Sequence, residues 1–460
     1  MAAPAAPADA RDLALQILEE TEKGRSNLDR IVQTALGARP DLARRDRALV
    51  FALVYGVQRW RRRLDWVAAH FASRPFDRIE ATVRQILRLA LFQLLFLTRV
   101  PPSAAVHTAV AMTKTRVPRA ASFVNALLRS ALRRGLQVPL PDLDADPVKA
   151  LGVGLSFPDW IVARWIDRDG LAAARARCTA ANRLPLLAVR ANTLKTDREA
   201  LLNLWRTEGL QGRPTPLAPD GIVIEGFQGN VDNLPGFSRG YFQVQDEAAQ
   251  LVGLLLAPKP GQRILDACAG LGGKTGHLAA LGANQAEILA TDQAPDRLAA
   301  LALEMRRLGA QGIHTRTVDW QNAPPLDGLP VFDRILLDAP CSGLGVLGRN
   351  PDGRWRRRAA DLTRCARRQQ TLLGHLADLL KPDGLLVYAV CSLEPEETCD
   401  VIRAFLQRRA DYGIAPPADV FAACAGPLIR AGGAVLTDPG KNPLDGFYMI
   451  GLQRRRAADP

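Results

Sequence analysis

Two cysteines, each followed by a serine, come directly after predicted strands: Cys341 in DAPCSG and Cys391 in AVCS. In a doubly wound sheet the ligand and the reacting groups lie beyond the carboxyl ends of the strands, so we expect both thiols and Asp338 to share one pocket. A thiolate is a strong nucleophile, and loop amides at a strand end favour its ionised form. A redox pair is the alternative, although the two cysteines stand in separate loops 50 residues apart.

A glycine-rich turn follows another predicted strand, where RILDACA leads into GLGGKTG and then into a helix. Gly270, Gly272 and Gly273 permit a tight turn and close approach of the backbone to a ligand, and the helix N-terminus favours negative charge. Asp292 ends the next strand 22 residues after Gly270, a spacing typical of a ribose-binding acid, and Asp319 ends a third strand. This pattern predicts an adenosyl-type ligand.

Three alternatives exist for this turn. A P-loop, GxxxxGK[ST], needs glycine where the chain has Cys268. A dinucleotide fingerprint, GxGxxG, needs glycine where the chain has Thr275. A tight strand-to-helix turn without any ligand is the third alternative, and the acids downstream argue against it.

A nucleophilic thiol beside an adenosyl pocket suggests one reaction in particular. Pyrimidine C5 is too weak a nucleophile to take a methyl group directly. A thiolate that adds to C6 makes C5 enamine-like, and an acid hydrogen-bonded at N3 stabilises the charge that develops. A base then removes the C5 proton and the thiol leaves.

The elements that must position these residues begin at residue 262, where predicted strands alternate with helices. The strands are RILDACA, EILATD, IHTRTVD, DRILLDAP and GLLVYAVC, and the helices cover 274–281, 295–308, 359–380 and 396–408. Strand and helix in alternation predict an α/β fold with a parallel, doubly wound sheet.

The residues before this region predict two other kinds of structure. Residues 11–135 have helical periodicity throughout, with an apolar central helix at 86–97, and predict an all-α bundle. The segment VPLPDLDADPVK predicts a linker, and the mixed pattern after it predicts a small α+β subdomain. We therefore expect a helical domain at 1–137, a linker at 138–150, an α+β subdomain at 151–240 and a doubly wound domain at 241–455.

Composition narrows the class of protein. Of the 460 residues, 48% are apolar and 23% charged, values typical of a soluble globular chain. The longest apolar run, LALFQLLFLT, is about half a membrane span, and no signal peptide is evident, so we expect a cytoplasmic protein. Because no cysteine lies in a CxxC or Cys/His cluster, we expect no metal site. Four cysteines are predicted to be small buried hydrophobic residues: Cys178, Cys365, Cys399 and Cys424.

The net charge of +13 is concentrated in residues 1–150, which hold 24 Lys and Arg against 14 Asp and Glu. This concentration predicts a polyanionic partner, although arginine-rich codon usage is an alternative reason for the excess of Arg over Lys. The basic residues on the flanks of the helical region are Arg59, Arg61, Arg62, Arg63, Arg116, Arg119, Arg133 and Arg134. A second set that could hold phosphates is Arg349, Arg354, Arg356, Arg357 and Arg358.

Four motifs resemble the Sun/Fmu (RsmB-type) bacterial 16S rRNA cytosine-5 methyltransferases: LDACAGLGGKT, LLDAPCSGLGVLGRNPDGRW, YAVCSLEPEE and DGFYMIGL. RANTLK (190–195) and FQVQDEAAQL (242–251) resemble that family's connecting segments, and the N-terminal helices resemble its NusB-like domain. The resemblance covers almost the whole chain. It implies a Rossmann-like methyltransferase domain that uses S-adenosylmethionine (SAM), and 16S rRNA or its precursor as partner. We expect no DNA or membrane partner, and a monomer.

The resemblance also implies a role for each site residue. Cys391 would be the nucleophile on cytosine C6, Cys341 would assist release of the methylated RNA, and Asp338 would contact N3 near the cofactor. Asp292 would bind the ribose and Asp319 the adenine side. The loop that would hold the methionine part of SAM consists of Cys268, Ala269, Gly270, Leu271, Gly272, Gly273 and Lys274.

The chain departs from the family pattern at three places. Gly270 and Leu271 replace the usual Ala-Pro, Val390 replaces the threonine before the nucleophile, and Asn350 stands where histidine is common. None of these changes removes a group that the chemistry requires. A tRNA cytosine-5 methyltransferase and a non-catalytic RNA-binding assembly factor remain alternatives, of which the second has no use for both Cys341 and Cys391.

Overall fold

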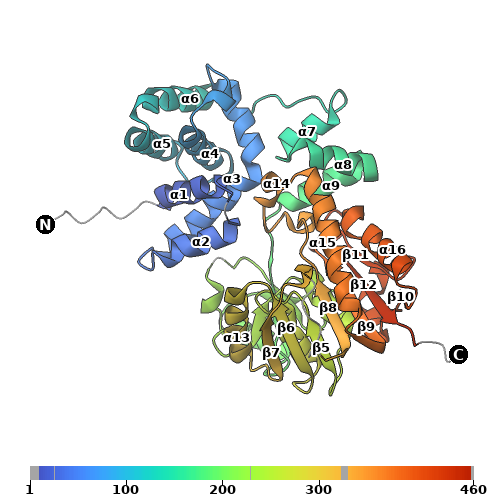
Figure 1. Ribbon diagram of the computed structural model, residues 1–460. Helices are drawn as coiled ribbons and strands as arrows, with labels where there is room; N and C mark the ends of the chain where they lie inside the picture. The colour runs from blue at the N-terminus through green and yellow to red at the C-terminus, as the bar shows by residue number, and fades with distance from the viewer. Residues whose placement is uncertain (1–9, 25, 228, 323–329, 457–460) are drawn as a thin grey trace. The chain divides into compact units, whose positions relative to one another are not determined.

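The computed structural model describes residues 10–24, 26–227, 229–322 and 330–456, and the chain divides into two compact units (Figure 1). The first unit consists of Met1–Arg183 and Leu347–Arg357, and the second of Leu184–Val346 and Arg358–Pro460. Among the described residues, no helix combines the length and the apolar character that crossing a membrane requires.

The first unit is built from helices around an apolar core. The helices that form this core are α1 (Ala10–Glu22), α2 (Leu28–Gly37), α3 (Arg44–Phe71), α4 (Ala81–Phe96), α5 (Pro102–Arg116) and α6 (Ala121–Arg134). As predicted, α4 is the central helix, because every residue from Gln85 to Gln93 is buried. The unit continues with α7 (Pro147–Gly154), α8 (Asp159–Asp169) and α9 (Leu171–Asn182).

Several basic residues on the flanks of these helices are engaged inside the unit rather than free for phosphates. They form the pairs Arg61–Glu22 (2.9 Å), Arg62–Asp159 (2.6 Å) and Arg116–Asp12 (2.8 Å). Arg59 is buried and donates to the Gly348 carbonyl at 2.6 Å. Arg119 pairs with Glu80 at 2.9 Å but keeps 84% of its side chain exposed, and Arg133 and Arg134 at the end of α6 are exposed as well.

The segment Leu347–Arg357, with the short helix α14 (Gly353–Arg356), lies in the first unit although it is flanked in sequence by the second. Arg354 is completely buried there, and its guanidinium carbon lies 3.9 Å from the centre of the Phe157 ring. Its acceptors are Ser156 O (3.0 Å), Asn182 Oδ1 (3.0 Å), Arg59 O (3.2 Å), Ala181 O (3.3 Å) and Leu347 O (3.4 Å). The prediction that Arg354 holds phosphate is therefore wrong, because its donors are taken up inside the protein.

The second unit begins with a small antiparallel sheet. Its strands run in the order β2 (Gly212–Pro214), β3 (Gly221–Ile224), β1 (Leu187–Ala191) and β4 (Phe242–Val244). Helix α10 (Arg198–Thr207) packs on this sheet through Trp205, which is fully buried and meets Phe242 edge to face. Asp197 caps α10 by accepting from the Ala200 amide at 2.8 Å.

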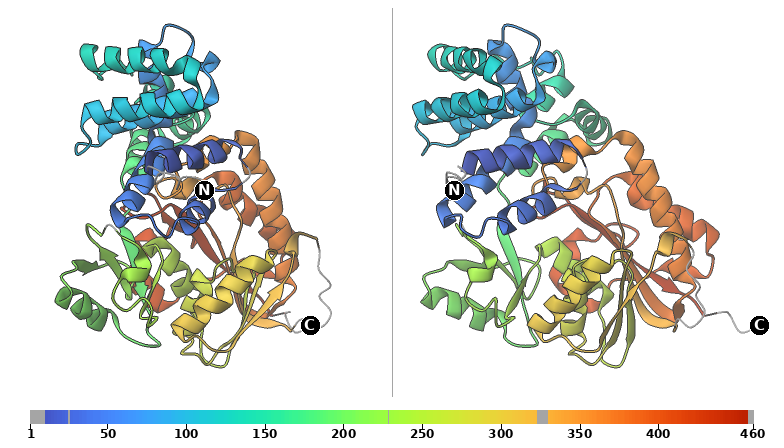
Figure 2. Two further views of the ribbon diagram at one scale, coloured as in Figure 1. Left: turned by 90° about the vertical axis from the view of Figure 1, so that its left-hand side faces the viewer. Right: turned by 60° about the vertical axis from the view of Figure 1, so that its left-hand side comes forward.

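A large mixed sheet forms the rest of this unit. Its strands run in the order β10 (Tyr412–Ile414), β12 (Phe447–Arg454), β9 (Leu380–Val390), β8 (Phe332–Asp338), β5 (Arg263–Asp266), β6 (Glu287–Asp292) and β7 (Ile313–Thr317), and β11 (Val435–Thr437) pairs with β12. The helices around it are α11 (Glu247–Leu256), α12 (Gly273–Leu281), α13 (Pro295–Leu308), α15 (Ala359–Ala377), α16 (Cys399–Arg408) and α17 (Asp419–Ala425) (Figure 2).

Successive residues of the central strands enter opposite cores, which is the pattern of a sheet covered on both faces. Leu265, Leu337 and Tyr388 pack in the core that includes α15 and α16, whereas their neighbours Ile264, Leu336 and Val387 pack in the core of α11 and α12. The predicted α/β fold class is confirmed, with all five predicted strands paired in parallel.

The structure differs from the sequence prediction at three places. Strands β10, β11 and β12 add an antiparallel edge that the sequence analysis did not assign. The helix expected at 396–408 begins at Cys399, because the turn η6 (Pro395–Glu397) ends at Thr398, whose φ of −120° and ψ of −105° are not helical. The helix expected to reach residue 380 ends at Ala377, because Leu380 already pairs with Phe332 in the sheet.

Arg354→Met is expected to destabilise the first unit. The variant leaves several buried carbonyl groups without donors, and each such group costs about 1–3 kcal/mol, so we expect the free energy of unfolding to fall by roughly 3–5 kcal/mol. Urea denaturation checks this value. Arg356→Met on the same helix is the control, because Arg356 is exposed and its loss should change stability by about 1 kcal/mol or less. Equal effects of the two variants would contradict the assigned role.

Candidate active site

The glycine-rich turn joins β5 to α12 at the carboxyl end of the large sheet. Gly270 and Gly272 have φ of 56° and 87°, in the left-handed region that favours glycine. A Cβ on Gly272 would lie 2.8 Å from Leu301 Cγ, so a side chain there would collide with α13. The Gly270 amide donates to Asp292 Oδ2 at 3.1 Å, which ties the turn to the end of β6.

Asp266, the last residue of β5, is the buried acid of the turn. Thr275 Oγ1 donates to its Oδ2 at 2.7 Å, whereas its Oδ1 is buried and has no hydrogen-bond partner among the described residues. Burial raises the pKa of Asp266 to about 7. A cation or hydrogen-bond donor bound beside this oxygen would satisfy it.

A cavity of about 380 Å³ opens at this end of the sheet within the second unit. Most of the residues expected to bind the cofactor line it: Cys268, Ala269, Gly270, Leu271, Gly273, Lys274 and Asp338. Gln245, Asp246, Ala249 and Asp266 also line it, and sequence reasoning did not single out their side chains. Gly272, Asp292 and Asp319 do not line it; Asp292 is buried under the turn, and Asp319 is exposed beyond β7.

Lys274 and Asp338 form an ion pair at the wall of this cavity, with 2.5 Å between Nζ and Oδ2. Burial opposes the charge of Lys274, but the Asp338 carboxylate outweighs it, so the pKa of Lys274 is raised. The lysine ammonium also interacts with Cys391 and lies 5.6 Å from the centre of the Phe447 ring. The predicted loop lysine is therefore paired directly with the predicted acid.

The two predicted catalytic thiols meet, with 3.1 Å between Cys341 Sγ and Cys391 Sγ. Both are free cysteines, so the contact is a hydrogen bond and not a disulfide. The hydrogen bond with Cys391 raises the pKa of the Cys341 thiol well above its ordinary value, and burial and the nearby carboxylates raise it further. The Cys341 thiol is thus kept in its neutral form while it lies in hydrogen-bond contact with Cys391.

The backbone around Cys391 is held by two glycines. The Gly345 amide donates to the Cys391 carbonyl at 3.0 Å, and the Gly446 amide donates to the Gly345 carbonyl at 2.8 Å. A Cβ on Gly345 would lie only 2.0 Å from the Gly446 carbonyl oxygen. The position therefore accepts only glycine.

Glu397 is a site residue that the sequence analysis did not identify. Its carboxylate is completely buried and accepts from the Ser342 amide at 2.7 Å, from Ser342 Oγ at 2.5 Å and from Ser392 Oγ at 2.6 Å. These serines directly follow Cys341 and Cys391. The motif LEPEE places several acids shortly after Cys391, but the sequence alone does not show which acid has a buried side chain.

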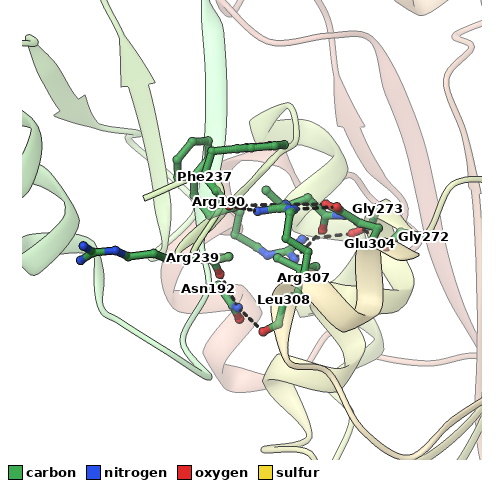
Figure 3. A network of polar contacts seen from close by, with 12 residues as sticks. Arg190, Asn192, Phe237, Arg239, Gly272, Gly273, Glu304, Arg307 and Leu308 are labelled. Atoms are coloured by element: carbon green, nitrogen blue, oxygen red, sulfur yellow. Dashed lines mark hydrogen bonds and ion pairs between the residues drawn. The ribbon is translucent and has the colours of Figure 1, made fainter. Parts of the chain in front are cut away.

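Arg190 of the small sheet supports the glycine-rich turn from behind (Figure 3). It is completely buried and donates to the Gly273 carbonyl at 3.2 Å, to Gln243 Oε1 at 2.9 Å and to Gln245 Oε1. Burial lowers the pKa of Arg190 to about 9, since its hydrogen-bond acceptors are neutral. Gln243 reaches the Gly272 carbonyl as well, at 3.5 Å.

Asn192, two residues further along RANTLK, strengthens the same junction (Figure 3). Its amide donates to the carbonyls of Gly240 and Leu308, each at 2.7 Å. Arg307 at the end of α13 donates to the Phe237 carbonyl at 2.6 Å and lies 4.1 Å from the centre of its ring. The small sheet is therefore fixed to both the glycine-rich turn and the end of α13.

The cysteines that were predicted to be buried differ in exposure. Cys178 is completely buried, as predicted, and Cys365 and Cys424 are partly buried. The prediction of burial is wrong for Cys399, the first residue of α16, which is exposed.

Three family models match successive parts of this chain. Residues 253–453 match the family model for the 16S rRNA methyltransferase RsmB/F, residues 8–133 match the NusB family, and residues 157–231 match a ferredoxin-like domain of RsmF/B-like methyltransferases. The probable ribosomal RNA small subunit methyltransferase B of Bacillus subtilis is 35% identical over 87% of this chain and 89% of its own length.

Two further similarities agree with this result. The ribosomal RNA small subunit methyltransferase B of Pseudomonas syringae pv. tomato is 37% identical over 86% of each chain. The crystal structure of PH0851 has the same fold, with a TM-score of 0.82 over 98% of this chain and 100% of that one at 24% identity. The resemblance indicated by the sequence motifs is thus confirmed, and the chain belongs to the RsmB/F family of 16S rRNA methyltransferases.

Proposed function

We propose that this protein transfers the methyl group of SAM to C5 of a cytosine in 16S rRNA, through a transient covalent bond between Cys391 Sγ and C6. The observation that carries the proposal is the meeting of two thiols, 3.1 Å apart, beside the Lys274–Asp338 pair. A methyltransferase that acts on a ring nitrogen or a ribose hydroxyl has no use for a pair of cysteines at this place.

The cavity suits the methionine end of SAM. Asp266 offers a buried oxygen without a partner, which an α-ammonium group would satisfy, and the Gly270–Gly273 turn leaves the backbone open to close approach. SAM supplies the electrophilic methyl group when bound. We assign Cys268 to Lys274 and Asp338 to the methionine part, and Asp292 and Asp319 to the ribose and adenine.

The chain's own residues divide the remaining chemistry. Cys391 Sγ adds to C6 and gives C5 the electrons that it needs for methyl uptake. Lys274 Nζ lies 2.5 Å from Asp338 Oδ2, and we assign this ion pair to N3, where negative charge develops during addition. The pair thereby stabilises the adduct on the side of the ring opposite to C6.

Cys341 is assigned to the second half of the reaction, in which the C5 proton leaves and the Cys391–C6 bond breaks. The largest cause that keeps Cys341 protonated is its hydrogen bond with Cys391. Bonding of Cys391 to C6 removes that cause, so the pKa of Cys341 falls once the adduct exists. Cys341 releases its proton to solvent at that stage. Its thiolate then accepts the C5 proton, and the electron pair of the C5–H bond expels the Cys391 thiolate.

We assign RNA binding partly to the helical unit. Arg119, Arg133 and Arg134 are exposed, although Arg119 also pairs with Glu80. They could neutralise RNA phosphates without reading the base sequence.

Cys391→Ser is expected to lower methyl transfer by more than ~1,000-fold, because a hydroxyl is not ionised at neutral pH and cannot add to C6. Incorporation of radiolabelled methyl groups into 16S rRNA measures this loss, and bisulfite sequencing identifies the base. Cys399→Ser, at an exposed cysteine, should retain full activity. Methyl transfer by Cys391→Ser at the normal rate would refute the covalent mechanism.

Cys341→Ser is expected to trap the protein on its RNA, because the methylated adduct forms but loses its C5 proton slowly. A protein–RNA band that survives denaturing electrophoresis reports the trapped species. The double variant Cys341→Ser, Cys391→Ser should give no such band, since it lacks the bonding sulfur. A band of equal strength from the double variant would assign the bond to another residue.

Arg190→Met is expected to weaken cofactor binding about tenfold, because the Gly273 carbonyl and two buried glutamines lose a charged donor, a loss worth roughly 1.4 kcal/mol. Calorimetry with S-adenosylhomocysteine as the probe measures the dissociation constant of the full chain. Arg239→Met in the same region is the control, because that side chain is exposed. Unchanged affinity in Arg190→Met would show that the turn holds its shape without the arginine.

A further inference from the structure

Glu397 joins the two loops that carry the cysteines. Ser342 follows Cys341 after β8, and Ser392 follows Cys391 after β9; the two hydroxyl oxygens lie 3.3 Å apart, and both hydroxyls donate to the same carboxylate. Gln369 of α15 completes the set of donors at 3.1 Å. The carboxylate is thus a single centre to which both reactive loops are bound.

The surroundings of Glu397 are unusual for a carboxylate. Its side chain has no exposed surface, and its hydrogen-bond donors, an amide nitrogen, two hydroxyls and a side-chain amide, are all neutral. Burial of a charge without a counter-charge opposes folding, and an apolar residue of similar size would fill such a place at less cost. Packing alone therefore does not explain why an acid occupies this position.

The position of Glu397 is itself fixed from two sides. The Tyr388 hydroxyl in β9 donates to the Glu397 backbone carbonyl at 2.6 Å, and Gln369 also donates to the Pro340 carbonyl at 3.1 Å, one residue before Cys341. A carboxylate held in this way defines the separation of the two loops, and with it the 3.1 Å between the sulfur atoms.

The charge of Glu397 also acts on Cys341. It is one of the causes that raise the pKa of Cys341. The charge thus favours the protonated form of Cys341.

We propose that Glu397 is a positioning residue for the reaction: it holds Cys341 beside Cys391 through Ser342 and Ser392, so that Cys341 reaches the adduct that Cys391 forms. This inference rests on the proposed covalent function. It assigns to one acid of the LEPEE motif a task in the release half of the cycle.

The experiment uses the full chain, SAM and a 16S rRNA transcript, and it compares Glu397→Gln with Glu396→Gln, a half-buried neighbour in the same turn. Glutamine fills the same volume but presents an NH₂ group to donors that need an acceptor. Because displacement of a reacting group by about 1 Å costs on the order of 100-fold, we expect kcat to fall by roughly 10- to 100-fold in Glu397→Gln, with the KM for SAM unchanged. Glu396→Gln should behave as the unaltered protein.

Two readouts separate positioning from a merely structural role. Covalent protein–RNA adduct should accumulate in Glu397→Gln, because release is slowed more than addition. The pH midpoint of adduct release should move to lower pH, since loss of a negative neighbour lowers the pKa of Cys341. A fall in SAM affinity with unchanged release, or an unchanged pH profile, would overturn the inference.

Serine variants keep the test decisive if Glu397→Gln does not fold. Ser342→Ala and Ser392→Ala each leave the carboxylate in place and remove one hydroxyl, and each should slow adduct release by about 3- to 10-fold. The double variant should slow release by less than the product of the two effects, because both act through one carboxylate. Normal release from both single variants would overturn the inference.

Failure of this inference differs from failure of the proposed function. An active Cys391→Ser refutes the covalent mechanism whatever Glu397 does. An inactive Cys391→Ser and a trapped Cys341→Ser, combined with normal release from the Glu397 and serine variants, refute only the role of Glu397.

Discussion

Strands β8 and β9 pair in parallel with Asp338 opposite Ala389, and this register determines where the two cysteine loops lie relative to each other. Three residues beyond Asp338 the chain reaches Cys341, and two residues beyond Ala389 it reaches Cys391. A slip of one residue in either strand would turn its buried side chains to the opposite face and carry one cysteine away from the other. The alternating burial of Leu336 and Leu337 on opposite faces therefore protects the geometry of the thiols as well as the core.

Much of this arrangement could be predicted from the sequence, because it depends on local patterns. The strands around Asp266, Asp292 and Asp338 have continuous apolar runs, and the glycines at 270 and 272 mark a turn that few other residues could form. The antiparallel edge was harder to predict, because β10 and β11 are three residues long and have no period to detect.

The contacts between distant residues could not be predicted in the same way. Glu397 and Arg354 look like ordinary surface charges in the sequence, and only the fold shows that one accepts from two serines and the other is enclosed by carbonyl groups. Arg190 lay inside a recognised motif, but its contact with Gly273 spans 83 residues. The sequence shows that a residue is charged. Whether its side chain is buried depends on the residues that pack around it in the fold.

Buried ionic groups with neutral partners occur at each of these positions. Arg354, Arg190 and Glu397 lie in different parts of the fold, and each is surrounded by carbonyls, amides or hydroxyls. Such groups contribute little net stability compared with apolar packing, but they have strict geometric requirements. They act where loops must keep a defined shape: the segment after Val346, the glycine-rich turn and the two cysteine loops.

The path of the chain through the two units limits how the protein can be divided into fragments. Because Leu347–Arg357 belongs to the helical unit while the residues on both sides of it belong to the other, no single cut separates the two units. A fragment that starts at Leu184 would carry Arg354 and Trp355 without Ser156, Asn182 and Gln58, the residues that accept their hydrogen bonds. A truncation, fusion or exchange of the helical unit must therefore include this eleven-residue insert. The helical unit is made of two separate stretches of chain, and both have to be moved together.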